Sequence, residues 1–353
     1  MVVIDRRTFN AMVTAGLAQV ALPAFPAEAA AAVMRDDVSP QSASAQLINP
    51  LPELGPIHQV RTDLMDIAYH TAGPAHGPAV LLGHGWPYSP DAYRHVMPQL
   101  ARRGFHVLVP YLRGHGPTRF RDKDIIRSGQ QAALGSDVIA FMDALGIRRA
   151  LFGGYDWGGR GVCVAAALWP ERCRGLVSVN SYLIQNLNET AIETPDPPEV
   201  ESAHWYYYYL LTERGAVGLA KNTKEFARVV WKRNSPKWRS TEADLDRAAR
   251  MFDNPDYIAV VLNVYRVRRH DAPTDPRYAD LEARLLKQPP ITVPAVTLDG
   301  LADGSLPPTN GASSAAHFTG PRVHHQVPDA GHNLPQERPE AFTDAVLEVS
   351  RLR

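Results

Sequence analysis

The sequence predicts an α/β fold, with a mostly parallel, doubly wound sheet and an inserted helical cap. Three observations predict it. Short apolar runs, typical of strands covered on both faces, alternate with helical segments through the first half of the chain. From about residue 183 to 289 this alternation gives way to aromatic and charged helical segments. Strands then resume and the chain closes with an amphipathic helix, so a cap of roughly a hundred residues interrupts one core.

Each predicted element rests on a local pattern. Residues 60–72 suit a pair of strands that opens the sheet. Continuous apolar stretches predict buried strands, and apolar positions that recur every three and four residues predict helices. In chain order, the further strands are 78–83, 106–110, 149–153, 175–179, 293–298 and 323–327, and the helices are 91–102, 130–145, 159–169 and 340–352.

Five parts are expected along the chain: an export signal (1–29), an arm or tether (30–55), the first part of the core (56–184), the helical cap (185–288) and the second part of the core (289–353). The leader resembles a twin-arginine signal, because paired arginines precede a mild apolar run and an A-x-A site. That run has about 15 residues, fewer than the ~20 of a membrane span. We therefore expect a periplasmic protein without stable membrane insertion, or a cytoplasmic one if the leader is not a signal.

Composition excludes several classes of protein. The 37 Lys and Arg residues balance 37 Asp and Glu residues, so no net charge attracts a nucleic acid. Thirty Pro and 25 Gly residues follow no repeat, which argues against collagen, solenoid and coiled coil. The two cysteines, Cys163 and Cys173, cannot build a disulfide framework or a thiolate zinc site, and we expect two buried, inert thiols. An α/β enzyme or binding protein remains.

The sharpest local signal is the segment Gly153-Gly154-Tyr155-Asp156-Trp157-Gly158-Gly159, between a predicted strand and a predicted helix. Small residues on both sides permit a tight turn that presents the central side chain at the top of the sheet, as in G-x-S-x-G hydrolases. Here the central residue is Asp156, whose carboxylate the amino end of the helix favours. Taken alone, such an aspartate is also typical of a helix cap.

The loops after three other strands favour a catalytic interpretation. His84-Gly85-Trp86-Pro87 follows an early strand, where a backbone N–H could stabilise an oxyanion, and His332 follows the last strand. Asp299 and Asp303 follow the penultimate strand and compete for the role of acid. The order nucleophile, acid, histidine is that of the α/β-hydrolase triad.

With these motifs, the sequence from about Pro56 to Arg353 resembles the epoxide hydrolase branch of the α/β-hydrolases. His84-Gly85-Trp86-Pro87 matches the H-G-x-P motif of that family, and Asp156-Trp157-Gly158-Gly159 matches its D-W-G-G elbow. The resemblance implies that Asp303, by its spacing, orients His332, and Asn180 leaves no acid at the position that some relatives use instead. It also implies two cap tyrosines that bind the epoxide oxygen, Tyr206 and Tyr265, with Tyr207 and Tyr209 as alternatives to the first.

The implied chemistry explains an aspartate in the elbow. A serine attacking an sp³ carbon would leave an ether, whereas Asp156 leaves an ester that water can hydrolyse. The two tyrosines would protonate the epoxide oxygen, and His332 would activate water. The N–H groups of Trp86 and Trp157 would form the oxyanion hole. This scheme requires no metal or organic cofactor, and His324 and His325, adjacent on a strand, face opposite ways and cannot easily share an ion.

The expected substrates are a small apolar or aromatic epoxide and water, because the cap carries many aromatic residues. The expected pocket residues are His84, Gly85, Pro87, Trp205 and Tyr209, and Trp231 and Trp238 add to the aromatic content of the cap. One rival is a haloalkane dehalogenase with the same triad, in which Trp157 would bind halide. A haloacid dehalogenase would usually carry Arg directly after the aspartate, where this chain has only Arg160 nearby. A non-catalytic receptor for small ligands on the same fold is the rival from another class.

Overall fold

The computed structural model describes residues 53–188 and 195–352 of the chain. The predicted export signal and all but the last three residues of the predicted arm lie outside them, so both stay predictions. One nine-stranded sheet runs through the described part. Its strands are β1 (His58–Arg61), β2 (Met65–Ala72), β3 (Ala79–Gly83), β4 (His106–Pro110), β5 (Arg119–Phe120), β6 (Ala150–Gly154), β7 (Cys173–Val179), β8 (Ala295–Gly300) and β9 (Arg322–Val327).

The sheet is mostly parallel, as predicted. Its strand order is β1-β2-β4-β3-β6-β7-β8-β9, with β5 paired to β2. The pairs from β4 to β9 are parallel, and β1, β2 and β5 form antiparallel pairs at one end. The two-residue strand β5 was not predicted, because two residues carry no periodicity that could distinguish a strand from a loop.

The remaining elements are helical. The α-helices of the core are α2 (Val96–Ala101), α3 (Gln131–Ala144), α4 (Asp156–Leu168), α12 (Leu334–Glu337) and α13 (Pro339–Val349), and those between β7 and β8 are α5 (Pro198–Ala203), α6 (Trp205–Tyr209), α7 (Glu213–Lys221), α8 (Thr223–Asn234), α9 (Glu242–Ala249), α10 (Tyr257–Val267) and α11 (Ala279–Leu285). Short 3₁₀ helices are η1 (Pro90–Tyr93), η2 (Pro170–Arg172), η4 (Arg250–Asp253), η5 (Pro276–Tyr278) and η6 (Ala312–His317).

Alternation along the central strands builds a core on each face of the sheet. Leu81 of β3 belongs to the cluster that includes residues of α3 and α4, whereas its neighbours Val80 and Leu82 belong to the cluster of α2 and α13. Successive side chains of a strand point to opposite faces, so a strand that is buried on both faces is apolar throughout. The continuous apolar run that predicted β3 has this origin.

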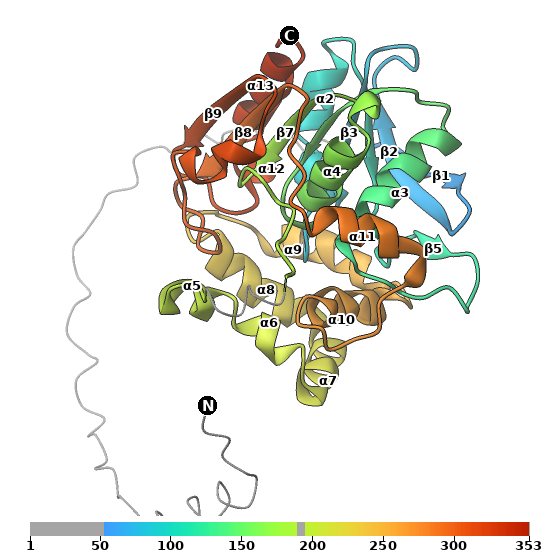
Figure 1. Ribbon diagram of the computed structural model, residues 1–353, viewed down its shortest axis with the longest axis vertical. Helices are drawn as coiled ribbons and strands as arrows, with labels where there is room; N and C mark the ends of the chain where they lie inside the picture. Colours follow the sequence, from blue (N-terminus) through green and yellow to red (C-terminus); the bar gives the residue numbers. More distant parts are fainter. Residues whose placement is uncertain (1–52, 189–194, 353) are drawn as a thin grey trace, which may run out of the picture. The chain divides into compact units, whose positions relative to one another are not determined.

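Helices α5 to α10 gather on one side of the sheet, below it in Figure 1. Two indole N–H groups attach them to the loop after β3: Nε1 of Trp86 donates to the Tyr257 hydroxyl at 2.8 Å, and Nε1 of Trp231 donates to the carbonyl of Pro87 at 2.9 Å. Between β7 and β8, the described residues contain helices and no strand. The cap helices therefore help to fix the loop after β3, which carries the predicted oxyanion donor Trp86.

Three further properties of the described residues bear on the sequence predictions. Cys163 and Cys173 are buried free thiols, as expected, and burial raises the pKa of Cys173 to about 12. His, Cys, Asp and Glu side chains form no group of three or more that could hold a metal ion in the described part. None of the helices in this part has the length and apolarity needed to cross a bilayer.

Candidate active site

Asp156 stands at a sharp turn between β6 and α4. Its φ of +50° lies in the left-handed region, an uncommon conformation for a residue with a side chain. The turn also needs glycine beside it, since a Cβ atom at Gly158 would lie 2.2 Å from the carbonyl carbon of Gly83. Helix α4 starts at Asp156, three residues before the predicted start, because the glycines that permit this contact weaken the helical pattern. The carboxylate is thereby held at the carboxyl end of the sheet.

His332 connects two carboxylates. Its Nε2 lies 3.3 Å from Oδ2 of Asp156, and its Nδ1 lies 2.9 Å from Oδ2 of Asp303. The backbone N–H groups of Ser305 and Leu306 donate to the other oxygen of Asp303 at 2.7 and 3.0 Å. Asp303 is therefore fixed on one side and orients the imidazole on the other.

Asp299, the rival for the role of acid, has other partners. Its Oδ2 accepts hydrogen bonds from the backbone N–H and the hydroxyl of Thr309 at 2.7 and 2.8 Å. Asn180 lies beside the acid that does contact His332, because its Nδ2 donates to Oδ2 of Asp303 at 3.1 Å. Among the described residues, the geometry thus joins Asp303 and not Asp299 to the imidazole.

The charges of His332 and its two neighbouring acids influence one another's pKa. Burial disfavours the imidazolium of His332, but the carboxylates of Asp303 and Asp156 outweigh it and hold its pKa well above the usual range. Burial also opposes ionisation of Asp156, yet its hydrogen bond to His332 and the charge there hold its pKa below the usual value. The two neighbouring acids therefore favour the imidazolium form of His332.

We expect His332 to stay protonated at pH 7, and Asp156→Asn to lower its pKa, because the substitution removes one negative neighbour. The raised pKa contributes stability that is present below the unfolded value of about 6.5 and is lost as pH rises through the folded value. Imidazole NMR signals, assigned by comparison with His332→Gln, measure this pKa directly. Asp299→Asn is the control that should leave the titration in place, and a His332 that titrates below about 6.5 would contradict the charge pair.

One of the two predicted oxyanion donors contacts Asp156 directly. The backbone N–H of Trp86 donates to Oδ1 of Asp156 at 2.6 Å. The imidazole of His84 holds this loop from within, because Nδ1 bonds the carbonyl of Gly85 at 2.9 Å and Nε2 accepts from the N–H of Leu112 at 3.2 Å. Trp157, the other predicted donor, follows Asp156 in the first turn of α4, where backbone N–H groups lack helical partners.

The two predicted cap tyrosines lie next to each other. Tyr206 of α6 and Tyr265 of α10 are buried, with ring centroids 5.6 Å apart. The ring of Tyr265 also lies 5.4 Å from that of Trp86 and 5.9 Å from that of Trp157. Burial raises the pKa of both phenols well above the usual value, so both remain proton donors. Tyr207, the alternative to Tyr206, has its ring 5.0 Å from Tyr265.

A cavity of about 630 Å³ opens beside Asp156 and His332. Its walls combine apolar and polar side chains from α4, from the loops after β7 and β8 and from the cap, among them Arg160, Tyr182, Leu183, Ile184, His204, Tyr207, Leu306, Pro307 and His317. Sequence reasoning missed most of this wall, because loop residues have no periodicity. The rule that the carboxyl ends of parallel strands form the ligand site could have pointed to the loops.

The expected pocket residues occupy other places. Trp205 and Tyr209 do not line this cavity; they pack with Phe226 in the core of the cap, at ring distances of 5.3 and 6.4 Å. His84, Gly85 and Pro87 shape the loop that carries the Trp86 N–H and are also absent from the cavity wall. An aromatic residue in an amphipathic cap helix can bury itself against the next helix as readily as against a ligand.

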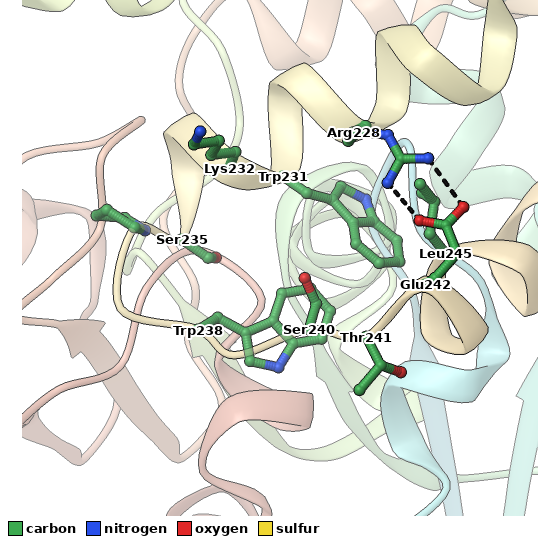
Figure 2. Close-up of a pocket in the computed structure, with 10 residues that line it drawn as sticks. Arg228, Trp231, Lys232, Ser235, Trp238, Ser240, Thr241, Glu242 and Leu245 are labelled. Atoms are coloured by element: carbon green, nitrogen blue, oxygen red, sulfur yellow. Dashed lines mark hydrogen bonds and ion pairs between the residues drawn. The ribbon is translucent and has the colours of Figure 1, made fainter. Parts of the chain in front are cut away.

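Trp231 and Trp238 line a separate pocket of about 270 Å³ between α8 and the segment leading into α9. Figure 2 shows the two indoles there, with the ion pair of Arg228 and Glu242 beside them. The ring of Trp231 also stacks on that of Tyr88, which belongs to the loop after β3, with ring centroids 5.2 Å apart. These two aromatics therefore support the cap and that loop from outside the cavity at Asp156.

Comparison with known proteins gives consistent matches. The model of the family described as the alpha/beta hydrolase fold matches residues 78–339. A crystal structure from Klebsiella pneumoniae, named a "putative epoxide hydrolase", is 44% identical, covers 84% of this chain and 97% of its own, and superposes with a TM-score of 0.81. Epoxide hydrolase A of Mycobacterium tuberculosis is 27% identical over 78% of this chain and 91% of its own. Bifunctional epoxide hydrolase 2 of Sus scrofa is 36% identical over 33% of this chain, which spans only 21% of that protein.

Proposed function

Because the chain belongs to the α/β-hydrolase fold family, in its epoxide hydrolase branch, we propose that it opens a small epoxide to a vicinal diol through a covalent ester on Asp156. The observation that carries this proposal is the contact of one imidazole with both Asp156 and Asp303. An aspartate at the elbow forms an ester with a carbon electrophile, and an adjacent, oriented histidine supplies the base that hydrolyses it. No metal or organic cofactor takes part in the proposed steps.

In the first step, Oδ2 of Asp156 attacks an epoxide carbon while Oδ1 stays bonded to the N–H of Trp86. The ring C–O bond breaks and its electron pair moves to the ring oxygen. That oxygen takes a proton from a cap phenol. Tyr206 and Tyr265 are the proposed donors, although they are buried and do not line the cavity, and Tyr207, which does line it, is the alternative. The proton that His332 holds in the free protein then returns to the phenolate, which leaves the imidazole neutral.

Loss of the charge on Asp156 prepares the second step. An ester is neutral, so one of the two carboxylates that raise the pKa of His332 disappears when it forms. The neutral imidazole, oriented by Asp303, takes a proton from water, and the hydroxide attacks the ester carbonyl. The N–H groups of Trp86 and Trp157 stabilise the oxyanion, a contribution of roughly 3 kcal/mol for each such donor. When the intermediate collapses, the bond from the carbonyl carbon to Oδ2 breaks and the proton of the added hydroxyl passes to the leaving alkoxide. The diol departs, and Asp156 is again a carboxylate beside the imidazolium.

The cavity supports an epoxide with an apolar or aromatic substituent. Tyr182, Leu183, Ile184 and Leu306 form the apolar part of its wall, and Tyr207 adds an aromatic face. With a volume of about 630 Å³, it accommodates a ring and a short chain beside the reacting carbon.

The test is the mass of the intermediate. His332→Gln removes the base, so the ester on Asp156 should accumulate when the variant is offered an aryl epoxide together with an alkyl bromide. Intact-protein mass spectrometry should show an added mass equal to the whole epoxide. Addition of the alkyl group alone, without bromide, would instead make the protein a haloalkane dehalogenase. An unmodified protein after exposure to both would refute the covalent mechanism, and the receptor interpretation would replace it.

A further inference from the structure

Arg160 lines the reaction cavity, and among the described residues its guanidinium group lacks a full set of hydrogen-bond acceptors. It lies one helical turn after Asp156 on α4, is 7% exposed and lines the cavity. Its Nε donates to the carbonyl of Leu183 at a long 3.3 Å. Its Nη1 is buried and has no hydrogen-bond partner among residues 53–188 and 195–352. A buried charged donor without an acceptor is costly, so this arrangement points to a ligand.

A second arginine adds positive charge next to it. The guanidinium of Arg268, at the end of α10, lies 5.3 Å from the ring centre of Tyr207 and 4.9 Å from that of Tyr265. Its Nη1 and Nη2 are buried and also lack partners within the described residues. Burial and the field of Arg268 lower the pKa of Arg160 to about 10. The positive charges of Arg160 and Arg268 thus act on each other near one residue of the cavity wall, Tyr207.

The charge of Asp156 acts on Arg160 from a distance, but among the described residues no carboxylate of the cavity is hydrogen-bonded to either arginine. Asp156 is bonded to the N–H of Trp86 and to His332, and Asp299 is bonded to Thr309. Asp196 is exposed to solvent. Inside the described part of the cavity wall, the positive charge of Arg160 and Arg268 is therefore matched by no carboxylate hydrogen-bonded to either guanidinium.

We propose that Arg160, reinforced by the charge of Arg268, binds a carboxylate group carried by the epoxide substrate. This rests on the proposed function and narrows its substrate class to epoxy acids. Asp156 and Arg160 line the same cavity, so a substrate whose epoxide carbon meets Asp156 can present an acid group to the guanidinium. The apolar wall of Leu183, Ile184 and Leu306 then receives the substituent on the other epoxide carbon.

If Arg160 only supported the nucleophile and bound no substrate, its substitution would have a different effect. Arg160 also helps to hold the pKa of Asp156 down, so its loss would impair every substrate alike if it served only the nucleophile. A carboxylate site instead discriminates between an acid and an amide of the same shape, because the amide carries no charge for the guanidinium. The ratio of the two affinities is therefore the quantity to measure.

Isothermal titration calorimetry should compare trans-phenylcyclopropanecarboxylate with its carboxamide, two unreactive analogues of a phenyl epoxy acid and its amide. The unaltered protein should bind the acid about 10- to 100-fold more tightly, as expected for a charge-assisted contact. Arg160→Met should reduce the ratio to less than about threefold, and Arg268→Met should reduce it in part. Arg269→Met is the matched control, because this exposed neighbour contacts Tyr208 instead and should keep the ratio.

Equal binding of acid and amide by the unaltered protein would overturn the inference even if a variant failed to fold, and so would a preference that survives Arg160→Met. Turnover of phenylglycidate and phenylglycidamide separates this inference from the proposed function. A clear preference for the acid analogue without hydrolysis of any epoxide would leave the carboxylate site standing and remove the activity. Hydrolysis of both epoxides with equal kcat/KM would keep the activity and refute the site.

Discussion

Asp156→Asn should reduce epoxide turnover by about 10⁴-fold or more, the size of loss expected when a nucleophile is removed. An amide oxygen does not displace an epoxide oxygen, so the ester cannot form. The substitution keeps the shape of the side chain, and its oxygen can still accept the N–H of Trp86, which donates to Oδ1 at 2.6 Å in the protein. The loss should therefore be chemical, with little change in fold. Steady-state kinetics on freshly purified variant measures it.

A double variant isolates the cause of that loss. Combining Asp156→Asn with His332→Gln should abolish the covalent adduct that His332→Gln alone accumulates, and intact mass shows this without any turnover. Circular dichroism should give the same spectrum for the variants and the unaltered protein. Substantial activity in Asp156→Asn, or an adduct on another residue of the double variant, would show that the nucleophile has been misassigned.

Asp303→Asn should slow turnover by about 10³- to 10⁴-fold, the effect of losing the carboxylate that orients a catalytic histidine. Formation of the ester should suffer less than its hydrolysis, because the imidazole acts as a base only in the second step. The intermediate should then accumulate during turnover, as seen by quenching the reaction and measuring intact mass. This signature separates a defect in water activation from general damage to the site.

Asn180, the amide next to Asp303, allows a rescue experiment for the Asp303→Asn variant. Nδ2 of Asn180 and Nδ1 of His332 converge on the same Oδ2 of Asp303, at 3.1 and 2.9 Å. The exchange Asn180→Asp with Asp303→Asn returns a carboxylate to within reach of the imidazole, and should recover at least about tenfold of the lost rate. Asp299→Asn should have little effect, since that acid bonds Thr309. A larger loss from Asp299→Asn than from Asp303→Asn would reverse the assignment.

The centre of the sheet was predictable because strands such as β3 and β6 are buried on both faces. The stretches 78–83 and 150–153 carry no charged or polar side chain, and β3 and β6 lie within one residue of the predicted strands 78–83 and 149–153 at each end. The start of α4 was harder to predict, since Gly158 and Gly159 weaken the helical pattern while providing room for the elbow. Local propensity and the close approach of backbones oppose each other here, and the close approach prevails.

The site was predictable where a motif fixes the backbone. The segment around Asp156 and the loop of Trp86 obey steric rules that appear directly in the sequence, and the structure joins them by a hydrogen bond. The cavity wall depends on which loop side chains converge, and on whether cap aromatics such as Trp205 face a ligand or a neighbouring helix. These are tertiary choices that no periodicity records, and the unpartnered Nη1 of Arg160 emerges only from the packed structure.

The two oxygens of Asp156 have different neighbours: a backbone N–H at Oδ1 and the imidazole of His332 at Oδ2. Under the proposed mechanism, the oxygen that attacks the epoxide leaves with the diol, and the solvent replaces it when the ester carbonyl is attacked. In each catalytic cycle, one carboxylate oxygen of Asp156 therefore leaves with the product, and an oxygen atom from water takes its place. The protein would keep its sequence indefinitely while the isotopic composition of a single side chain followed that of the surrounding water.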